Sequence, residues 1–401
     1  MKFVGILGLF VMLGIAYLLS TDRKHFPWRT VLAGTAMQLT FALIILKTTA
    51  GRVGMQWISD RVAAFLNLAD EGSREIFGQN FTEHFFAFKV LPTIIFFSSF
   101  IAVLYYFGVV QMVVKLFARV MMKLLGTSGA ESLSASANIF VGQTEAPLLI
   151  RPYVAGMTRS ELMAVMTGGF STVAGGVLAA YIGMGVSAGH LIAASVMSAP
   201  AALVMAKIMI PEREQSQTAG EVRMEVELPW VNVIDAAAQG AADGLKLALN
   251  VGAMLLAFLS LIAVVNAGLA PIGRFVGVED LSLQLLLGLI FAPLAWVMGV
   301  PWAEATTVGS LLGIKTAANE FIAYDQLSKL LSGEGLSERS TVIATYALCG
   351  FSNFSSIAIQ IGGIGSIAPE RKSELAQLGL RGMIAGSLAC FQTATIAGLL
   401  I

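Results

Sequence analysis

Four short strings, two in each half of the chain, decide the fold. GQTEAP at 142–147 precedes GGFSTVAGG at 168–176, and AANEF at 317–321 precedes CGFSNFSS at 349–356. Each half carries a Thr-Glu or Asn-Glu pair followed by Gly-Phe-Ser, and the matching strings lie 175 and 181 residues apart. An internal duplication explains this agreement, with chance similarity in a Gly- and Ser-rich chain as the alternative.

The composition identifies a membrane protein. Of 401 residues, 56% are hydrophobic and 12% charged, whereas roughly a quarter are charged in a soluble domain. Several charge-free windows reach the ~20 residues with which a helix crosses a bilayer. We therefore expect an all-α polytopic membrane protein. The first window lacks the cleavage site of a signal sequence, so we expect it to be a retained helix. The windows are 3–21, 30–46, 90–114, 162–206, 247–273, 281–303, 340–369 and 382–401.

Charge and cysteine content exclude other classes. The chain has 25 basic and 25 acidic residues and no polybasic block, so it lacks the positive surface that nucleic-acid binding needs. The two cysteines and three scattered histidines do not form a disulfide framework or a spaced metal site.

The two Glu-containing strings predict re-entrant hairpins. Glu145 lies at the polar centre of 128–157, and Pro147 follows it. Two limbs of about a dozen residues each reach only ~18 Å, so the tip lies near the membrane midplane. The segment 303–331, centred on Glu320, has the same pattern.

The glycine-rich strings predict broken helices. They lie midway in windows that must cross, and lipid cannot satisfy the backbone groups that a break sets free. The repeats are inverted if 281–300, which contains Pro293, does not cross. Three spans, at 160–185, 187–210 and 246–273, then separate the hairpins. The residues alone leave this choice open.

Four segments follow from these boundaries. The first contains N-terminal helices and, at 51–70, an amphipathic helix that lies in the membrane interface, with a solvated connecting helix as the alternative. The predicted segments are 1–86 (N-terminal helices, which the family resemblance given below implies are scaffold helices), 87–210 (first repeat), 211–245 (hydrophilic connection) and 246–401 (second repeat).

Glu145 and Glu320 are the chief charges that lie neither at segment ends nor in loops. A charge at bilayer depth costs at least ~2.5–3.5 kcal/mol, so each needs a function or a partner such as Arg151 or Lys315. Two carboxylates at matching repeat positions favour a binding site. The neighbouring groups are amides and hydroxyls without Lys or Arg, which suits a neutral, polyhydroxylated solute: Gln143, Thr144, Asn319, Ser352, Asn353, Ser355 and Ser356.

Longer strings around these residues resemble the concentrative nucleoside transporters. They are NIFVGQTEAPLLIRPY at 138–153, GGFSTVAGGVLAAYIGMG at 168–185, GIKTAANEFIAY at 313–324 and ALCGFSNFSSIAIQIGGIG at 347–365. The resemblance implies about eight transmembrane helices, two re-entrant hairpins in inverted repeats, a trimerising scaffold domain and a transport domain that moves like an elevator. It also implies that 281–300 is not an ordinary span and that the protein lies in the bacterial inner membrane.

The resemblance implies a nucleoside site and a sodium site. Nucleobase contacts are expected from Gln143, Thr144, Glu145 and Val177, ribose contacts from Glu320, Asn353 and Ser356, and packing near the base from Phe351. Sodium is expected near the first hairpin tip, with side-chain ligands from Asn138 and Thr172 and carbonyl ligands from Val141 and Val173.

The expected function is secondary active symport of nucleosides with sodium across the lipid bilayer, by a homotrimer. One alternative is coupling to protons. Another is an intramembrane hydrolase, although the membrane windows contain no Ser-x-x-Lys or Gly-x-Ser-x-Gly element with a partner His.

Overall fold

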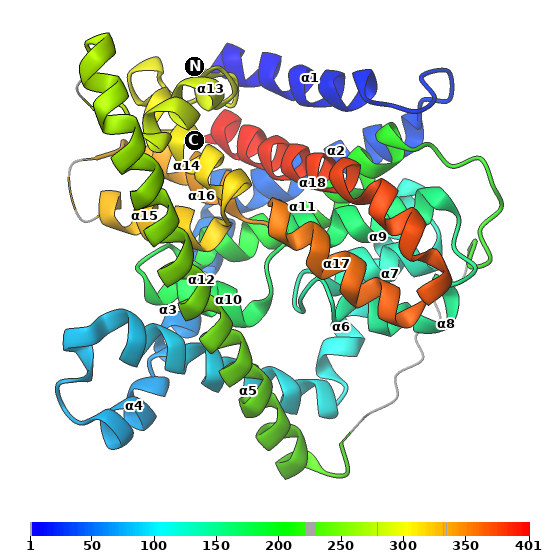
Figure 1. Ribbon diagram of the computed structural model, residues 1–401. Coiled ribbons are helices and arrows are strands. Elements are labelled where there is room, and N and C mark those ends of the chain that lie inside the picture. Colours follow the sequence, from blue (N-terminus) through cyan, green and yellow to red (C-terminus); the bar gives the residue numbers. More distant parts are fainter. Residues whose placement is uncertain (1, 221–229, 279, 332, 334) are drawn as a thin grey trace.

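The computed structural model describes residues 2–220, 230–278, 280–331, 333 and 335–401, and these form helices and connections without any strand (Figure 1). The α-helices are α1 (Lys2–Leu18), α2 (Trp28–Lys47), α3 (Thr49–Leu66), α4 (Ala69–Phe77), α5 (Leu91–Tyr106), α6 (Val109–Leu125), α7 (Gly129–Ala137), α8 (Arg151–Val154), α9 (Arg159–Ser171), α10 (Gly175–Gly183), α11 (Ala188–Met209), α12 (Val233–Val276), α13 (Leu283–Val297), α14 (Trp302–Ala317), α15 (Glu320–Leu331), α16 (Glu338–Leu348), α17 (Phe354–Ile367) and α18 (Lys372–Leu400). Shorter 3-10 or π turns are η1 (Phe81–His84), η2 (Phe86–Val90), η3 (Ala146–Ile150) and η4 (Pro369–Arg371).

The helix lengths confirm a polytopic membrane protein. In the described part of the chain, six helical segments are long and apolar enough to cross a bilayer. The apolar helices α1 and α17 are shorter than these six. The six are Trp28–Lys47, Phe86–Tyr106, Arg159–Gly183, Ala188–Met209, Val233–Phe275 and Pro369–Leu400.

Both predicted hairpins are present. In the first, Ser128 caps α7 through a capping box with Glu131, and the chain returns through η3 and α8. In the second, α14 ends at Ala317 and α15 begins at Glu320. The Asn319 side chain accepts a hydrogen bond from the Ile322 amide at 2.9 Å, which satisfies one of the free amides of the new helix. Each reversal therefore lies next to the predicted Glu.

The element α13 does not continue as an ordinary span. Its axis is bent by 117° from that of α14, across a short break at residues 298–301. The two helices then pack closely, because a Cβ on Gly309 would lie 2.6 Å from the Gly288 carbonyl oxygen. Membrane-length helices in α9–α10, α11 and α12 thus separate the hairpins, and this odd number is what inverted repeats require.

The long helix α12 begins earlier than the predicted connection 211–245 implied. The Asn232 side chain caps it by accepting hydrogen bonds from the amides of Ile234 and Asp235, both at 3.0 Å. Within the predicted connection, Asp235 and Asp243 therefore lie at exposed positions of a helix rather than in a loop. Residues 221–229, also within the predicted connection, lie outside the described residues.

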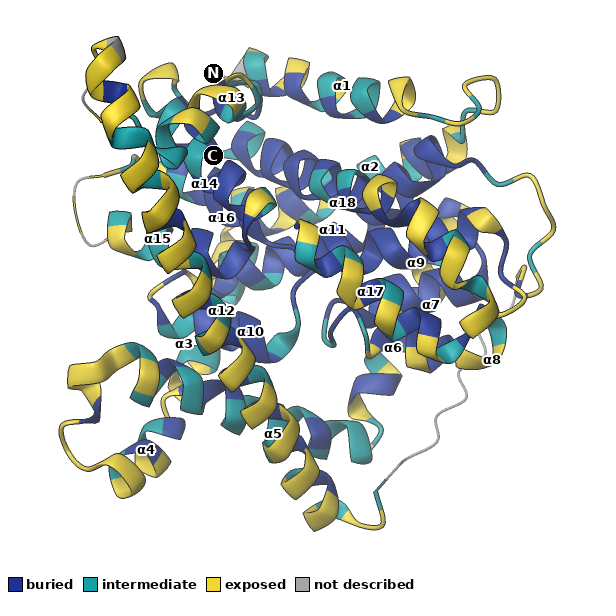
Figure 2. Cartoon of the chain, in the orientation of Figure 1, coloured by how far each residue is buried: buried dark blue, intermediate teal, exposed yellow. Residues whose placement is uncertain are grey.

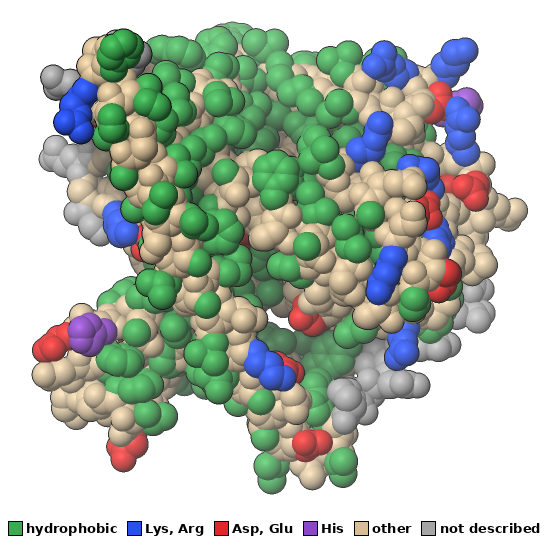
Figure 3. Space-filling view, in the orientation of Figure 1, with side chains coloured by type: hydrophobic (Ala, Val, Ile, Leu, Met, Phe, Trp, Pro, Cys, Tyr) green, Lys and Arg blue, Asp and Glu red, His purple; other side chains and the backbone are tan. Residues whose placement is uncertain are grey.

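The buried core runs through the middle of the molecule. Helices α9 and α11 and the C-terminal two thirds of α18 are largely buried, whereas α12 and the lobe of α3 and α4 are mostly exposed (Figure 2). Many of the exposed side chains are apolar. On the face shown in Figure 3, many Lys and Arg side chains gather on the right, around α8 and the α1–α2 connection, and a few others lie at the left edge and on α12. An outside with many apolar side chains and few charges is the pattern that a bilayer requires.

Candidate functional site

Two broken helices meet at the centre of the molecule. The α9 helix stops at Ser171, α10 starts at Gly175, and the second break separates α16 from α17. The Phe351 amide donates a hydrogen bond to the Thr172 carbonyl oxygen at 3.2 Å, which joins one break to the other. A Cβ on Gly350 would lie 2.8 Å from the Phe170 carbonyl oxygen, so this contact requires glycine. The predicted breaks are confirmed, and they touch.

Glu320, at the tip of the second hairpin, is about 5% exposed. Its Oε1 accepts a hydrogen bond from the Tyr181 hydroxyl at 3.0 Å, and its Oε2 accepts one from Asn353 Nδ2 at 3.0 Å. The suggested partner Lys315 instead donates to the Ala347 carbonyl oxygen at 2.8 Å. Glu320 is thus held by neutral donors from both broken helices.

The Asn353 side chain bonds both to the N-terminus of α17 and to Glu320. Its Oδ1 accepts hydrogen bonds from the Ser356 amide (3.0 Å) and the Ser355 hydroxyl (2.7 Å), which caps α17. The capping contact directs the amide nitrogen of Asn353 toward Glu320. The helix break and the carboxylate position therefore depend on the same side chain.

The first hairpin tip is arranged differently. Gln143 is buried, with Nε2 donating to the Ser356 hydroxyl at 3.3 Å and Oε1 accepting from Gln360 at 3.0 Å. Glu145 is exposed in this structure, and its only partner among the described side chains is the Thr144 hydroxyl at 3.0 Å. Unlike Glu320, it remains open to an incoming group.

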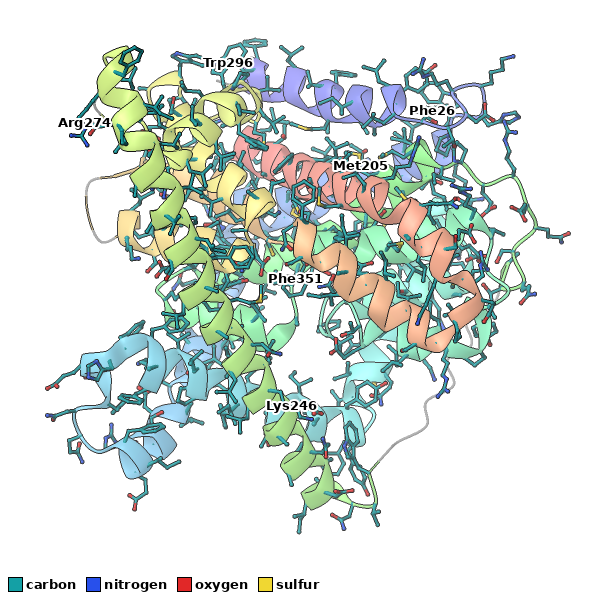
Figure 4. The ribbon with its side chains drawn as sticks, in the orientation of Figure 1. Phe26, Met205, Lys246, Arg274, Trp296 and Phe351 are labelled. Atoms are coloured by element: carbon teal, nitrogen blue, oxygen red, sulfur yellow. The ribbon has the colours of Figure 1, made fainter. Side chains whose placement is uncertain are left out.

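A cavity of about 1730 Å³ joins the two hairpin tips. Figure 4 labels Phe351 near the centre of the view, just before α17. The opposite wall comes from α5 and α12, through Ser98, Tyr105 and Asn250. All eight side chains predicted to bind substrate line this one cavity: Gln143, Thr144, Glu145, Val177, Glu320, Phe351, Asn353 and Ser356.

The predicted sodium residues gather beside the first break. Asn138 is 1% exposed, and its Nδ2 donates to the Ser134 carbonyl oxygen at 3.0 Å. Its Oδ1 is buried with no hydrogen-bond partner among the described residues. Gly168 lies against this residue, since a Cβ added to it would be 3.2 Å from Asn138 Nδ2. The Gly168 carbonyl oxygen accepts a hydrogen bond from the Thr172 hydroxyl at 3.0 Å.

The other two predicted ligands are the carbonyl groups of Val141 and Val173. Both residues lie outside the helices, and the hydrogen bonds of the described residues include none to either carbonyl oxygen. The Gly175 amide donates to the Phe140 carbonyl oxygen at 3.3 Å, which brings the two segments together. Unpaired oxygen atoms are the ligands that a hard cation requires.

Two residues of the site were missed in the sequence. Tyr181 holds Glu320, and Gln360 holds Gln143. Both lie in the quoted family strings, as polar groups inside charge-free windows. A polar side chain inside an apolar window was the signal that could have identified them. Their partners, Glu320 and Gln143, could not be identified from it, because they lie 139 and 217 residues away in the chain.

Three family models cover most of the chain. The description "Na+ dependent nucleoside transporter N-terminus" matches residues 7–80, "Nucleoside recognition" matches 87–188, and "Na+ dependent nucleoside transporter C-terminus" matches 190–398.

Similar proteins are transporters, not enzymes, which removes the hydrolase alternative. An uncharacterized transporter of Haemophilus influenzae is 49% identical, covering 99% of this chain and 97% of that protein. The sodium/nucleoside cotransporter 1 of mouse is 42% identical over 100% of this chain, which spans 64% of the mouse protein.

The fold matches solved structures equally well. The structure of CNTnw in an inward-facing substrate-bound state has a TM-score of 0.94 and 46% identity, covering 100% of this chain and 98% of that one. Outward-facing and intermediate structures of CNTnw variants match with TM-scores of 0.93 to 0.95. The chain belongs to the Na+ dependent nucleoside transporter family, as the resemblance to concentrative nucleoside transporters indicated.

Proposed function

We propose that this protein imports nucleosides by symport with sodium. The observation that carries the proposal is the position of Glu320, a buried carboxylate that lines the shared cavity and is held only by neutral donors among the described residues. A carboxylate without a paired cation is a strong acceptor for two adjacent hydroxyl groups. A ribose supplies that pair.

The two hairpin tips divide the substrate between them. Glu320, Asn353 and Ser356 bind the ribose hydroxyls. The base lies toward the first hairpin, where Gln143, Thr144 and Glu145 offer donors and acceptors. The base also packs against the apolar surfaces of Val177 and Phe351. The cavity supports this division because it contains both polar groups at the tips and apolar side chains between them.

Sodium binds beside the first hairpin tip, through Asn138, Thr172 and the carbonyl oxygens of Val141 and Val173. The unpartnered Asn138 Oδ1 supports this assignment, because a buried acceptor left without a partner is costly. The ion stabilises the irregular backbone on which Gln143 lies, and this is how sodium binding favours nucleoside binding.

The proposed transport cycle moves one unit of the protein against another. The hairpins and broken helices form the transport domain, and it moves like an elevator along a scaffold domain that assembles as a homotrimer in the bacterial inner membrane. In this scheme 1–86 is the N-terminal scaffold segment, 87–210 and 246–401 are the two repeats, and the connection 211–245 is shortened by the start of α12 at Val233. The cavity wall supports the division, since it joins hairpin residues to α5 and α12.

Uptake by purified protein in liposomes tests the proposal. We expect labelled uridine, adenosine or cytidine to accumulate when an inward sodium gradient is imposed, and not when choline replaces sodium. Absence of sodium-dependent uptake of all three nucleosides contradicts the proposal. Uptake that ignores sodium but follows an imposed pH gradient selects the proton-coupled alternative, with Glu145 or Glu320 as the proton carrier.

A further inference from the structure

Gln360, on α17, contacts the Gln143 side chain and is not itself one of the residues that line the cavity. Its side chain is fully buried, and its Nε2 donates to Gln143 Oε1 at 3.0 Å and to the Met166 carbonyl oxygen at 3.1 Å. A backbone carbonyl only accepts hydrogen bonds. The nitrogen of Gln360 must therefore face Met166, which determines the orientation of the whole amide.

The orientation of Gln360 determines that of Gln143. Because Gln360 presents a donor, Gln143 must turn its oxygen toward it and its nitrogen toward Ser356, where the bond is 3.3 Å. A flipped Gln143 would place two donors against each other in a buried position. Among the described residues the Gln143 nitrogen donates only to Ser356, and Gln143 also lines the cavity. Its second N–H proton is available to a ligand.

The pair packs closely against Gly169, where a side chain would not fit. A Cβ on Gly169 would lie 2.8 Å from Gln360 Nε2 and 2.9 Å from Gln143 Cβ. Gly169 lies in the last turn of α9, just before the first break. Gln143 and Gln360 therefore pack together against Gly169, which is part of the broken helix α9–α10.

We propose that Gln360 is a positioning residue that determines which nucleobases the transporter prefers, by holding Gln143 as a hydrogen-bond donor toward the base. The inference rests on the proposed nucleoside transport. Nucleobases differ in the donors and acceptors along their edges. Uracil has a carbonyl oxygen where cytosine has an amino group, so a fixed donor distinguishes them and a freely rotating amide does not.

The test compares base selectivity with ribose selectivity in Gln360→Met, which keeps the length of the side chain and removes both donors. We expect the ratio of kcat/KM between the best and the worst of uridine, cytidine, adenosine and inosine to shrink by about fivefold, roughly 1 kcal/mol. The ratio between uridine and 2′-deoxyuridine reports on the Glu320 side of the cavity and should stay within about twofold.

A double variant tests the route of the effect. In a Gln143→Met background, adding Gln360→Met should leave the base ratios unchanged, because the side chain that Gln360 orients is gone. If Gln360→Met fails to fold, as judged by thermal unfolding in detergent, Gln360→Glu replaces it. That variant keeps the size but offers acceptors, so we expect an altered order of base preference.

A matched control lies elsewhere in the same protein. Gln392 is equally buried and donates its Nε2 to Gln38 Oε1 at 2.9 Å, but it does not line the cavity. Gln392→Met should leave both ratios as in the wild type.

Three outcomes overturn the inference: unchanged base ratios in Gln360→Met or its substitute, an equal loss for all nucleosides, or base ratios that also shift in Gln392→Met. Failure of the wild type to transport any nucleoside overturns the proposed function instead.

Discussion

The bases of the two hairpins carry related residues in different surroundings. Glu131 and Glu304 each stand third in the first limb of their hairpin, 173 residues apart. Glu304 accepts hydrogen bonds from the exposed Ser337 hydroxyl (2.8 Å) and amide (3.3 Å). Glu131 instead pairs with buried Lys207 at 2.7 Å, and Lys207 also contacts Glu212 at 3.1 Å. One carboxylate position is thus part of a buried ion cluster and the other a solvated cap.

The tips differ in the opposite sense. At the first hairpin, Glu145 is open to the cavity, whereas at the second, Glu320 is buried and bonded on both oxygens. The hairpin with the buried ion cluster at its base therefore has the more accessible carboxylate at its tip. The comparison shows that duplication preserved the positions of charged residues while burial changed their energetic roles.

The largest expected effect is at the base of the first hairpin. Lys207→Met leaves Glu131 buried without its cation, and breaking a buried ion pair from one side costs about 3–5 kcal/mol. Denaturant or thermal unfolding in detergent measures the loss. Glu304→Gln is the matched change at the second hairpin and should cost less than about 1 kcal/mol. Equal losses in the two variants would contradict the distinction between buried and solvated bases.

The next effect separates the two tips. Glu320→Gln removes the charge-assisted bonds to the ribose, worth about 1.5–3 kcal/mol, so kcat/KM for uridine uptake should fall roughly 10- to 150-fold. Glu145→Gln should cost less, because its carboxylate is solvated before the nucleoside binds. Wild-type affinity in Glu320→Gln would assign that carboxylate a structural role. A larger loss in Glu145→Gln would reverse the proposed division of the substrate.

Sodium dependence should belong to the first hairpin alone. Asn138→Ala removes the unpartnered oxygen, and we expect the half-saturating sodium concentration to rise roughly tenfold, about 1.4 kcal/mol. The repeat offset of 173–175 residues places Asn138 opposite Leu311, Leu312 or Gly313 in the second hairpin. None of these has a side-chain amide. Thr316→Ala in that hairpin is the control. Unchanged sodium dependence in Asn138→Ala removes the residue from the ion site.

The smallest effect concerns the support of Glu320. Tyr181→Phe deletes one hydrogen bond, while the ring can remain stacked on Tyr324 at a centroid distance of 4.1 Å. We expect a loss of about 1 kcal/mol, seen as a roughly fivefold higher KM for uridine. Tyr324→Phe, which loses the bond to the Thr345 carbonyl oxygen and no bond to Glu320, should leave KM unchanged. Equal changes in both variants would mean that the effect comes from packing.

Much of the fold followed from local patterns. The breaks at 168–176 and 349–356 and the reversals near Glu145 and Glu320 were predictable, because glycine, hydroxyl residues and a central carboxylate interrupt a helix where they stand. The start of α12 was not predictable from local patterns, because Asn232 caps the helix within the charge-rich stretch 211–245. Composition marks solvent exposure there, and an exposed helix has the same composition as a loop.

By itself, the sequence determined the membrane class, the duplicated architecture and the family, and the family resemblance pointed to eight of the residues that line the cavity. The tertiary structure alone decided which groups meet. Tyr181 and Gln360 reach their partners across 139 and 217 residues of chain. The pairing of Lys207 with Glu131 likewise depends on α11 passing beside the first hairpin. Helix breaks depend on residues next to one another in the chain, whereas hydrogen-bond partners depend on where distant helices cross, which no local pattern encodes.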